Sequence, residues 1–183
     1  MKSLSKKTLA ICSGMALLVS GASVAWAQTS IRDQRGQLSE RDYKFVVDAA
    51  RGGMLEVNLG ELAHQKGSLQ AVRDFGQMMV TDHTKANDEL KRIVTQKGAM
   101  LPATLSHHEQ STLESLQTKL GKDFDKDYAA DMVKDHRTDL KDFESAAKDL
   151  SDPDLRAFAQ KTIPILEKHL RMAKDMEASV KTE

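Results

Sequence analysis

The chain has 183 residues, and its 27 basic and 27 acidic side chains give it no formal net charge at pH 7. That balance argues against nucleic acid or an anionic membrane surface as a partner, because both recruit proteins with a marked excess of Lys and Arg. A chain of this length accommodates one domain with its own apolar core.

The first 27 residues have the pattern of a secretory signal peptide. Three lysines precede an apolar stretch at 8–19, and Ala25-Trp26-Ala27 matches the small-x-small pattern of a cleavage site. We therefore expect cleavage after Ala27, export to the periplasm or cell envelope of a bacterium, and no integral membrane segment afterwards. A retained single membrane anchor is the alternative, although the apolar stretch falls short of the ~20 residues that spanning needs. Cleavage removes the only cysteine, Cys12, so packing must stabilise the mature domain.

Five helices are expected along the mature chain. Residues 28–38 have no helical period and are predicted to be a flexible lead-in. From 39 to 180 the apolar residues recur with helical spacing, and Gly, Pro and capping residues separate the helical segments. These segments are predicted at about 40–66, 69–97, 106–120, 123–149 and 153–180.

The four long segments are amphipathic, and their apolar stripes must be buried against one another in a four-helix bundle. Short connections make the first two helices and the last two helices antiparallel hairpins. The connection between the hairpins, 98–122, is far longer than a hairpin needs and contains the short helix. We therefore predict an all-α, ferritin-like bundle in which this connection returns along the bundle. The alternative is a short helix that folds beside one end.

Two similar stretches carry the candidate chemistry. Phe75-Gly-Gln-Met-Met-Val-Thr-Asp-His83 is followed later by Tyr128-Ala-Ala-Asp-Met-Val-Lys-Asp-His136, and both lie within predicted helices. On a helical wheel both aspartates of these stretches lie further inward than the histidines that follow them. Glu56 and His169 lie on the apolar stripes of the first and last long helices.

Helix lengths place these groups at similar heights near the middle of the bundle, so we expect one polar layer. Buried carboxylates and imidazoles need partners, because burying them without any costs several kcal/mol. One solution is a layer of internal Asp–His and Glu–His hydrogen bonds that fixes the register of the helices. The other is a transition metal ion, zinc, copper or a single iron, with aspartates hydrogen-bonded behind the ligands. The predicted ligands are Glu56, His83, His136 and His169, with Asp82 and Asp135 behind them.

A carboxylate-bridged di-iron site is not indicated by the pattern. Such sites use Glu-x-x-His motifs that face the bundle interior. The only such motif noted here, Glu61-Leu-Ala-His64, lies on the outer face of its predicted helix.

Several motifs together resemble the bacterial family known as domain of unknown function 4142. The resemblance spans about residues 40–178 and rests on Phe45, 52–60, 72–83, 128–136, 158–164 and 166–170. It implies a ferritin-like bundle exported to the periplasm or cell envelope, in a family often labelled as outer-membrane proteins. It supplies no activity and therefore no catalytic residues, although the family's recurring Glu and His positions fall on Glu56, His83, His136 and His169.

The sequence shows no nucleophile–base pair and no phosphate-binding loop, so the first hypothesis is a non-enzymatic protein. In it the polar layer is structural or binds a metal for storage, buffering or a stress response. The second hypothesis is a metal-dependent oxidoreductase acting on oxygen or peroxide. The third is a cell-envelope interaction module that binds a partner protein or a second copy of itself.

Overall fold

The computed structural model describes residues 34–182, and within that range it contains five α-helices and no β-strand. The helices are α2 (Glu40–Lys66), α3 (Gln70–Gln96), α4 (His107–Gln117), α5 (Gly121–Asp149) and α6 (Pro153–Thr182). The predicted all-α class is confirmed, and each predicted helix end lies within about three residues of the observed one. The predicted signal peptide and its cleavage site after Ala27 lie outside the described residues.

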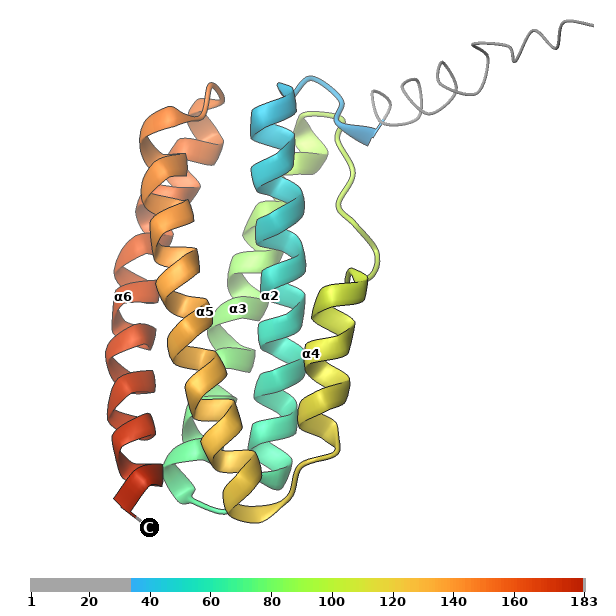
Figure 1. Ribbon diagram of the computed structural model, residues 1–183. Helices are drawn as coiled ribbons and strands as arrows, with labels where there is room; N and C mark the ends of the chain where they lie inside the picture. The colour runs from blue at the N-terminus through green and yellow to red at the C-terminus, as the bar shows by residue number, and fades with distance from the viewer. Residues whose placement is uncertain (1–33, 183) are drawn as a thin grey trace, which may run out of the picture.

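The long helices form two antiparallel hairpins, α2–α3 and α5–α6, that pack side by side (Figure 1). The connection between them runs back along the outside of the bundle, where α4 lies against α2. It returns the chain to the end of the bundle at which α3 begins, so α5 runs parallel to α3. This is the predicted ferritin-like arrangement, with the extra helix in the long connection.

The helices begin and end at residues whose side chains or backbone suit those positions. Ser39 caps α2 by accepting a hydrogen bond from the backbone N–H of Asp42 at 3.1 Å. Ser106 and Glu109 form a capping box at the start of α4. Gly98 follows α3 with φ = 67°, in the left-handed region that favours glycine.

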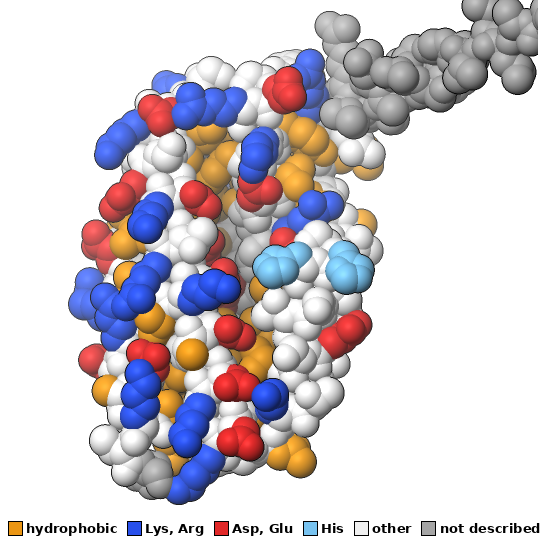
Figure 2. Space-filling view, viewed as in Figure 1, with side chains coloured by type: hydrophobic (Ala, Val, Ile, Leu, Met, Phe, Trp, Pro, Cys, Tyr) orange, Lys and Arg blue, Asp and Glu red, His pale blue; other side chains and the backbone are white. Residues whose placement is uncertain are grey.

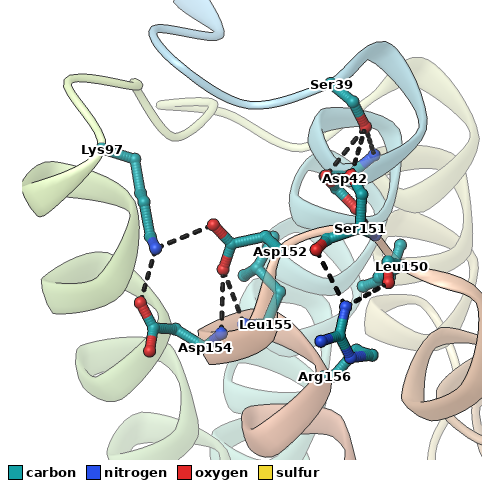
Figure 3. A network of polar contacts seen from close by, with 9 residues as sticks. All are labelled: Ser39, Asp42, Lys97, Leu150, Ser151, Asp152, Asp154, Leu155 and Arg156. Atoms are coloured by element: carbon teal, nitrogen blue, oxygen red, sulfur yellow. Dashed lines mark hydrogen bonds and ion pairs between the residues drawn. The ribbon is translucent and has the colours of Figure 1, made fainter.

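The two hairpin turns are held by equivalent contacts. Arg73 of α3 donates through Nη1 to two carbonyl oxygens of the α2–α3 turn, at 2.6 and 2.7 Å. Arg156 of α6 does the same at the α5–α6 turn, at 2.7 and 2.8 Å (Figure 3). Each arginine therefore satisfies backbone acceptors that the end of the preceding helix leaves free.

Each turn is also bound by an aspartate from the other hairpin. Asp125 of α5 accepts hydrogen bonds from the backbone N–H groups of Ser68 and Leu69, both at 2.9 Å. At the opposite end, Asp42 of α2 accepts from the backbone N–H of Ser151 at 2.8 Å and from its hydroxyl (Figure 3). Both aspartates are buried, so these charge-assisted bonds connect the hairpins at both ends of the bundle.

These matching contacts reveal an internal repeat with an interval of 83 residues. The α3 stretch Val72-Arg-Asp-Phe-Gly-Gln77 recurs in α6 as Leu155-Arg-Ala-Phe-Ala-Gln160, and Asp42 recurs as Asp125. The same interval pairs Glu56 with Asp139. The recurrence noted in the sequence has a different interval. It pairs 75–83 with 128–136 and relates the parallel helices α3 and α5.

The core consists of two apolar clusters with a polar layer between them. One cluster surrounds Phe75 and Tyr128, and the other surrounds Phe143 and Phe158. Each long helix contributes to both clusters, and a buried polar residue lies at or next to the change from one cluster to the other. These residues are Glu56, His83, His136 and His169. The predicted polar layer is therefore present near the middle of the bundle.

The last residues of the predicted lead-in contact the end of α3. The backbone N–H of Gln37 donates to the carbonyl of Lys97 at 3.0 Å, and Leu38 is buried. Across residues 34–182, no helix has the length and apolar character required to cross a membrane.

Candidate metal centre

Three histidines from three helices meet in the polar layer. His83 of α3, His136 of α5 and His169 of α6 have exposed fractions of 8%, 0% and 1%. Their ring centroids are 5.3 to 5.8 Å apart, and one ring nitrogen from each lies within 4.8 Å of the other two. The helical scaffold thus brings three potential nitrogen ligands to one point.

Hydrogen bonds fix the tautomers of two of these rings. His169 Nε2 lies 3.0 Å from Oδ2 of Asp82, and because a carboxylate accepts, Nε2 carries the proton. His136 Nδ1 lies 3.0 Å from the backbone carbonyl oxygen of Met132, so in this ring Nδ1 is the donor. His169 Nδ1 and His136 Nε2 consequently retain their lone pairs. Such an outer hydrogen bond also orients histidines that ligate metals.

Three further ring nitrogens have no partner within residues 34–182. His83 Nε2, His136 Nε2 and His169 Nδ1 are all buried and form no hydrogen bond with any described group. A layer built on internal Asp–His and Glu–His bonds would have satisfied these atoms. Instead, the arrangement suits an ion that accepts lone pairs from three neutral imidazoles, as Zn²⁺ and copper do.

Burial keeps the three rings uncharged. It lowers the pKa of His83 well below 6.5, and the neighbouring imidazoles of His136 and His169 lower it further. Burial, together with the nearby His169, lowers the pKa of His136 to about 4. The pKa of His169 is also lowered by burial, although the Asp82 carboxylate opposes that shift. Neutral imidazole is the form that binds metals, so at neutral pH no proton has to leave first.

A group of carboxylates lies on the other side of His136. Glu56 Oε1 is 3.6 Å from His136 Nδ1, and one carboxylate oxygen from each of Glu56, Asp135 and Asp139 lies within 4.8 Å of the other two. Burial raises the pKa of Glu56 well above 4.5, with a further contribution from Asp135. Burial and Asp135 likewise raise the pKa of Asp139 well above 3.8. Two carboxylates hydrogen-bond to each other only when one is protonated, so this group favours either a proton or a cation.

The structure brings the predicted residues together in two sets rather than one. Glu56 approaches His136 Nδ1, not the unpartnered Nε2, and its neighbour is Asp135. Asp82 pairs with His169 of α6 rather than with the adjacent His83. Metal binding by any of these residues stays a prediction.

The prediction that the aspartates point further inward than the histidines is wrong. His83 is buried, whereas the Asp82 side chain is 24% exposed. Phe75 does not mark the centre of the buried face of α3, which also includes Val72 and Gly76. Those residues shift the centre of that face toward His83. The outward orientation predicted for Glu61 and His64 is confirmed, since both are exposed.

Asp139 is not among the residues predicted from the sequence. The structure includes it in the carboxylate group. The 83-residue interval that pairs it with Glu56 is the signal that could have identified it.

A small cavity of about 40 Å³ adjoins the histidines and is lined by His83, His169 and the glycines at 52 and 53. A Cβ added at Gly53 would fall 2.0 Å from Oδ1 of Asn87, so a side chain here would displace the Asn87 amide. The volume is enough for a water molecule or a similarly small ligand. A ligand there would lie beside the imidazoles of His83 and His169.

Comparisons with known proteins identify the fold and leave the chemistry open. A family model described as "Domain of unknown function (DUF4142)" matches residues 27–176. The crystal structure of a DUF305 fragment from Deinococcus radiodurans is similar, with a TM-score of 0.67 and 12% sequence identity. That similarity covers 80% of this chain and 99% of the fragment. No curated protein matches the sequence.

Proposed function

Since the chain belongs to the family described as Domain of unknown function (DUF4142), which carries no assigned activity, we propose a function from the site alone. The protein is a metal-binding bundle that holds one transition metal ion through His83, His136 and His169. Its role is to store or buffer that ion. The observation that supports this proposal is the set of three buried ring nitrogens, all within one bundle layer and none hydrogen-bonded within residues 34–182.

The donor set suits zinc or copper better than a carboxylate-bridged iron pair. Three imidazoles match the affinity of both ions for nitrogen, and Zn²⁺ commonly takes three protein ligands with a fourth position left for a small molecule. Asp82 supports the proposal because it orients His169 through a direct hydrogen bond. The signal peptide predicted in the sequence supports a role outside the cytoplasm.

Metal titration of the purified protein tests the proposal. After chelator treatment, we expect the protein to bind one equivalent of Zn²⁺ or copper per chain and to gain thermal stability on binding. The His83→Ala, His136→Ala double variant should lose this binding while it keeps its helical circular dichroism. A matched control replaces the exposed histidines of α4, as His107→Ala with His108→Ala, and should bind as the wild type does.

Other outcomes favour the rival hypotheses. If zinc, copper and iron neither bind nor shift the melting temperature, the metal proposal is wrong. If the double variant also unfolds, the layer serves to fix helix register. The outer faces of the helices would then be the functional surface, as expected for an interaction module.

An oxidoreductase that acts on oxygen or peroxide is a second candidate, and the cavity beside His83 and His169 is the observation that favours it. A molecule of oxygen or peroxide in this cavity would lie next to the imidazoles of His83 and His169. Peroxide consumption by copper- or iron-loaded protein, absent from the double variant, would support this function over storage. Stable binding without turnover would exclude it.

A further inference from the structure

The three carboxylates beside the histidines lie close together without hydrogen-bond donors between them. Glu56 of α2 meets Asp135 and Asp139 of α5, with oxygens within 4.8 Å of one another. Glu56 is completely buried, and neither of its oxygens accepts a hydrogen bond from any described residue. Ionised carboxylates are acceptors only, so the three groups can satisfy one another only through a shared proton. A buried carboxylate directed at two others without a donor is an arrangement that a cation stabilises.

The imidazole N–H of His136 does not supply a hydrogen bond to Glu56. His136 Nδ1 is 3.6 Å from Glu56 Oε1, beyond hydrogen-bond length, and it already donates to the carbonyl of Met132. The buried hydroxyl of Tyr128 is also without a hydrogen-bond partner among residues 34–182. Glu56 therefore lies among groups that leave its oxygens free.

An acidic groove leads to this group from the surface. It has a volume of about 410 Å³ and lies between α2, α4 and α5. Asp135 and Asp139 line it, together with Asp48, Asp131 and Glu109, whereas the basic side chains of its described lining are Lys134 and His108. Figure 2 shows this side of the molecule, with acidic side chains along the hollow between α5 and α4. Such a concentration of negative charge attracts cations and leaves space for their water ligands.

We propose that Glu56, Asp135 and Asp139 form a second cation site, distinct from the three-histidine centre, that takes a hard divalent cation of the Mn²⁺ class. Three carboxylates with access to water provide the oxygen ligands that Mn²⁺, Mg²⁺ and Ca²⁺ prefer, whereas the imidazoles select zinc or copper. The two sites meet at His136, whose Nδ1 faces Glu56 and whose Nε2 belongs to the nitrogen set. The bundle thus separates a nitrogen site from an oxygen site within one layer.

Mn²⁺ binding followed by electron paramagnetic resonance tests the proposal, because free Mn²⁺ gives a signal that is lost on binding. With the full chain, we expect one saturable Mn²⁺ site, present with or without one equivalent of Zn²⁺. Glu56→Gln and Asp139→Asn should each weaken Mn²⁺ binding at least about tenfold, since loss of even an outer partner has effects of that size. Both variants should still bind Zn²⁺ in equal stoichiometry.

Asp131→Asn is the matched control, because Asp131 lies one turn before Asp135 on α5 and lines the same groove. It should leave Mn²⁺ affinity within about twofold of the wild type, because Asp131 is not among the three carboxylates whose oxygens lie within 4.8 Å of one another. Equal weakening by all three substitutions would show diffuse attraction to the groove and overturn the site. So would the absence of saturable Mn²⁺ binding.

The three-histidine site and the three-carboxylate site can be tested independently of each other. His83→Ala with His136→Ala should abolish Zn²⁺ binding, and retained Mn²⁺ binding in that variant would show that the oxygen site is independent. If Mn²⁺ competes with Zn²⁺ for a single equivalent, one mixed site exists and the second site does not.

Discussion

At the scale of single residues, the polar layer is defined by which atoms lack partners. Asp82 satisfies one nitrogen of His169, and the Met132 carbonyl satisfies one nitrogen of His136. The opposite nitrogens remain unpaired, as does Nε2 of His83. A buried polar atom without a partner costs about 1–3 kcal/mol, so without metal these nitrogens destabilise the fold.

Replacing His83 with leucine should therefore stabilise the metal-free protein. His83→Leu keeps a side chain of similar volume and removes an unpartnered buried nitrogen, so we expect a gain of about 1–2 kcal/mol. The same variant should lose the stabilisation that zinc or copper gives to the wild type. Thermal unfolding followed by circular dichroism, with a chelator and then with metal, measures both effects.

The control for this experiment is the exposed His107. His107→Leu should alter stability by no more than about 0.5 kcal/mol and should retain the response to metal. A loss of more than about 1 kcal/mol in metal-free His83→Leu would mean that the histidine forms part of a stabilising hydrogen-bonded layer.

At the scale of helices, the positions of the side chains depend on how closely the helix backbones approach. Gly60 of α2 and Gly76 of α3 face each other, and a Cβ on Gly76 would lie 2.6 Å from the carbonyl oxygen of Gly60. A side chain at either position would force the two helices apart. This close contact lies within the apolar cluster on one side of the histidine layer, where it sets the separation of α2 and α3.

Gly76→Ala should consequently destabilise the bundle even though alanine favours helices. We expect a loss of about 1–3 kcal/mol, typical of overpacking, measured by urea unfolding. Gly52→Ala is the matched control, because a Cβ there meets nothing within 4 Å. That variant should gain about 0.5–1 kcal/mol from helix propensity. Equal gains in both variants would show that the helices separate at little cost.

Most of the helix arrangement could be predicted because local signals agree with the fold. Ser39, Ser106 and Gly98 mark helix ends through capping and backbone conformation, and the long connection implies the parallel arrangement of α3 and α5. The site was less predictable. A helical wheel gives direction but not distance, so it placed Glu56 with the three histidines and could not separate nitrogen from oxygen ligands.

At the scale of the whole molecule, the 83-residue repeat explains how the two hairpins combine. Each hairpin supplies an aspartate that binds the turn of the other, Asp125 at one end and Asp42 at the opposite end. These bonds lie at the ends of the bundle, whereas the histidine layer lies near the middle. The end contacts therefore set the register of the hairpins without taking part in the site.

Asp125→Ala tests this separation of roles. The substitution removes two charge-assisted bonds and leaves the N–H groups of Ser68 and Leu69 without their acceptor, so we expect a loss of about 3 kcal/mol. Amide hydrogen exchange should accelerate first at the α2–α3 turn. Metal binding at 20 °C should persist, because the histidines contact neither the turn nor Asp125.

Asp123→Ala is the matched control, because it removes an exposed carboxylate from the same first turn of α5. It should lower the free energy of unfolding by less than about 1 kcal/mol. Loss of metal binding in folded Asp125→Ala would show instead that the ends of the bundle control the geometry of its centre.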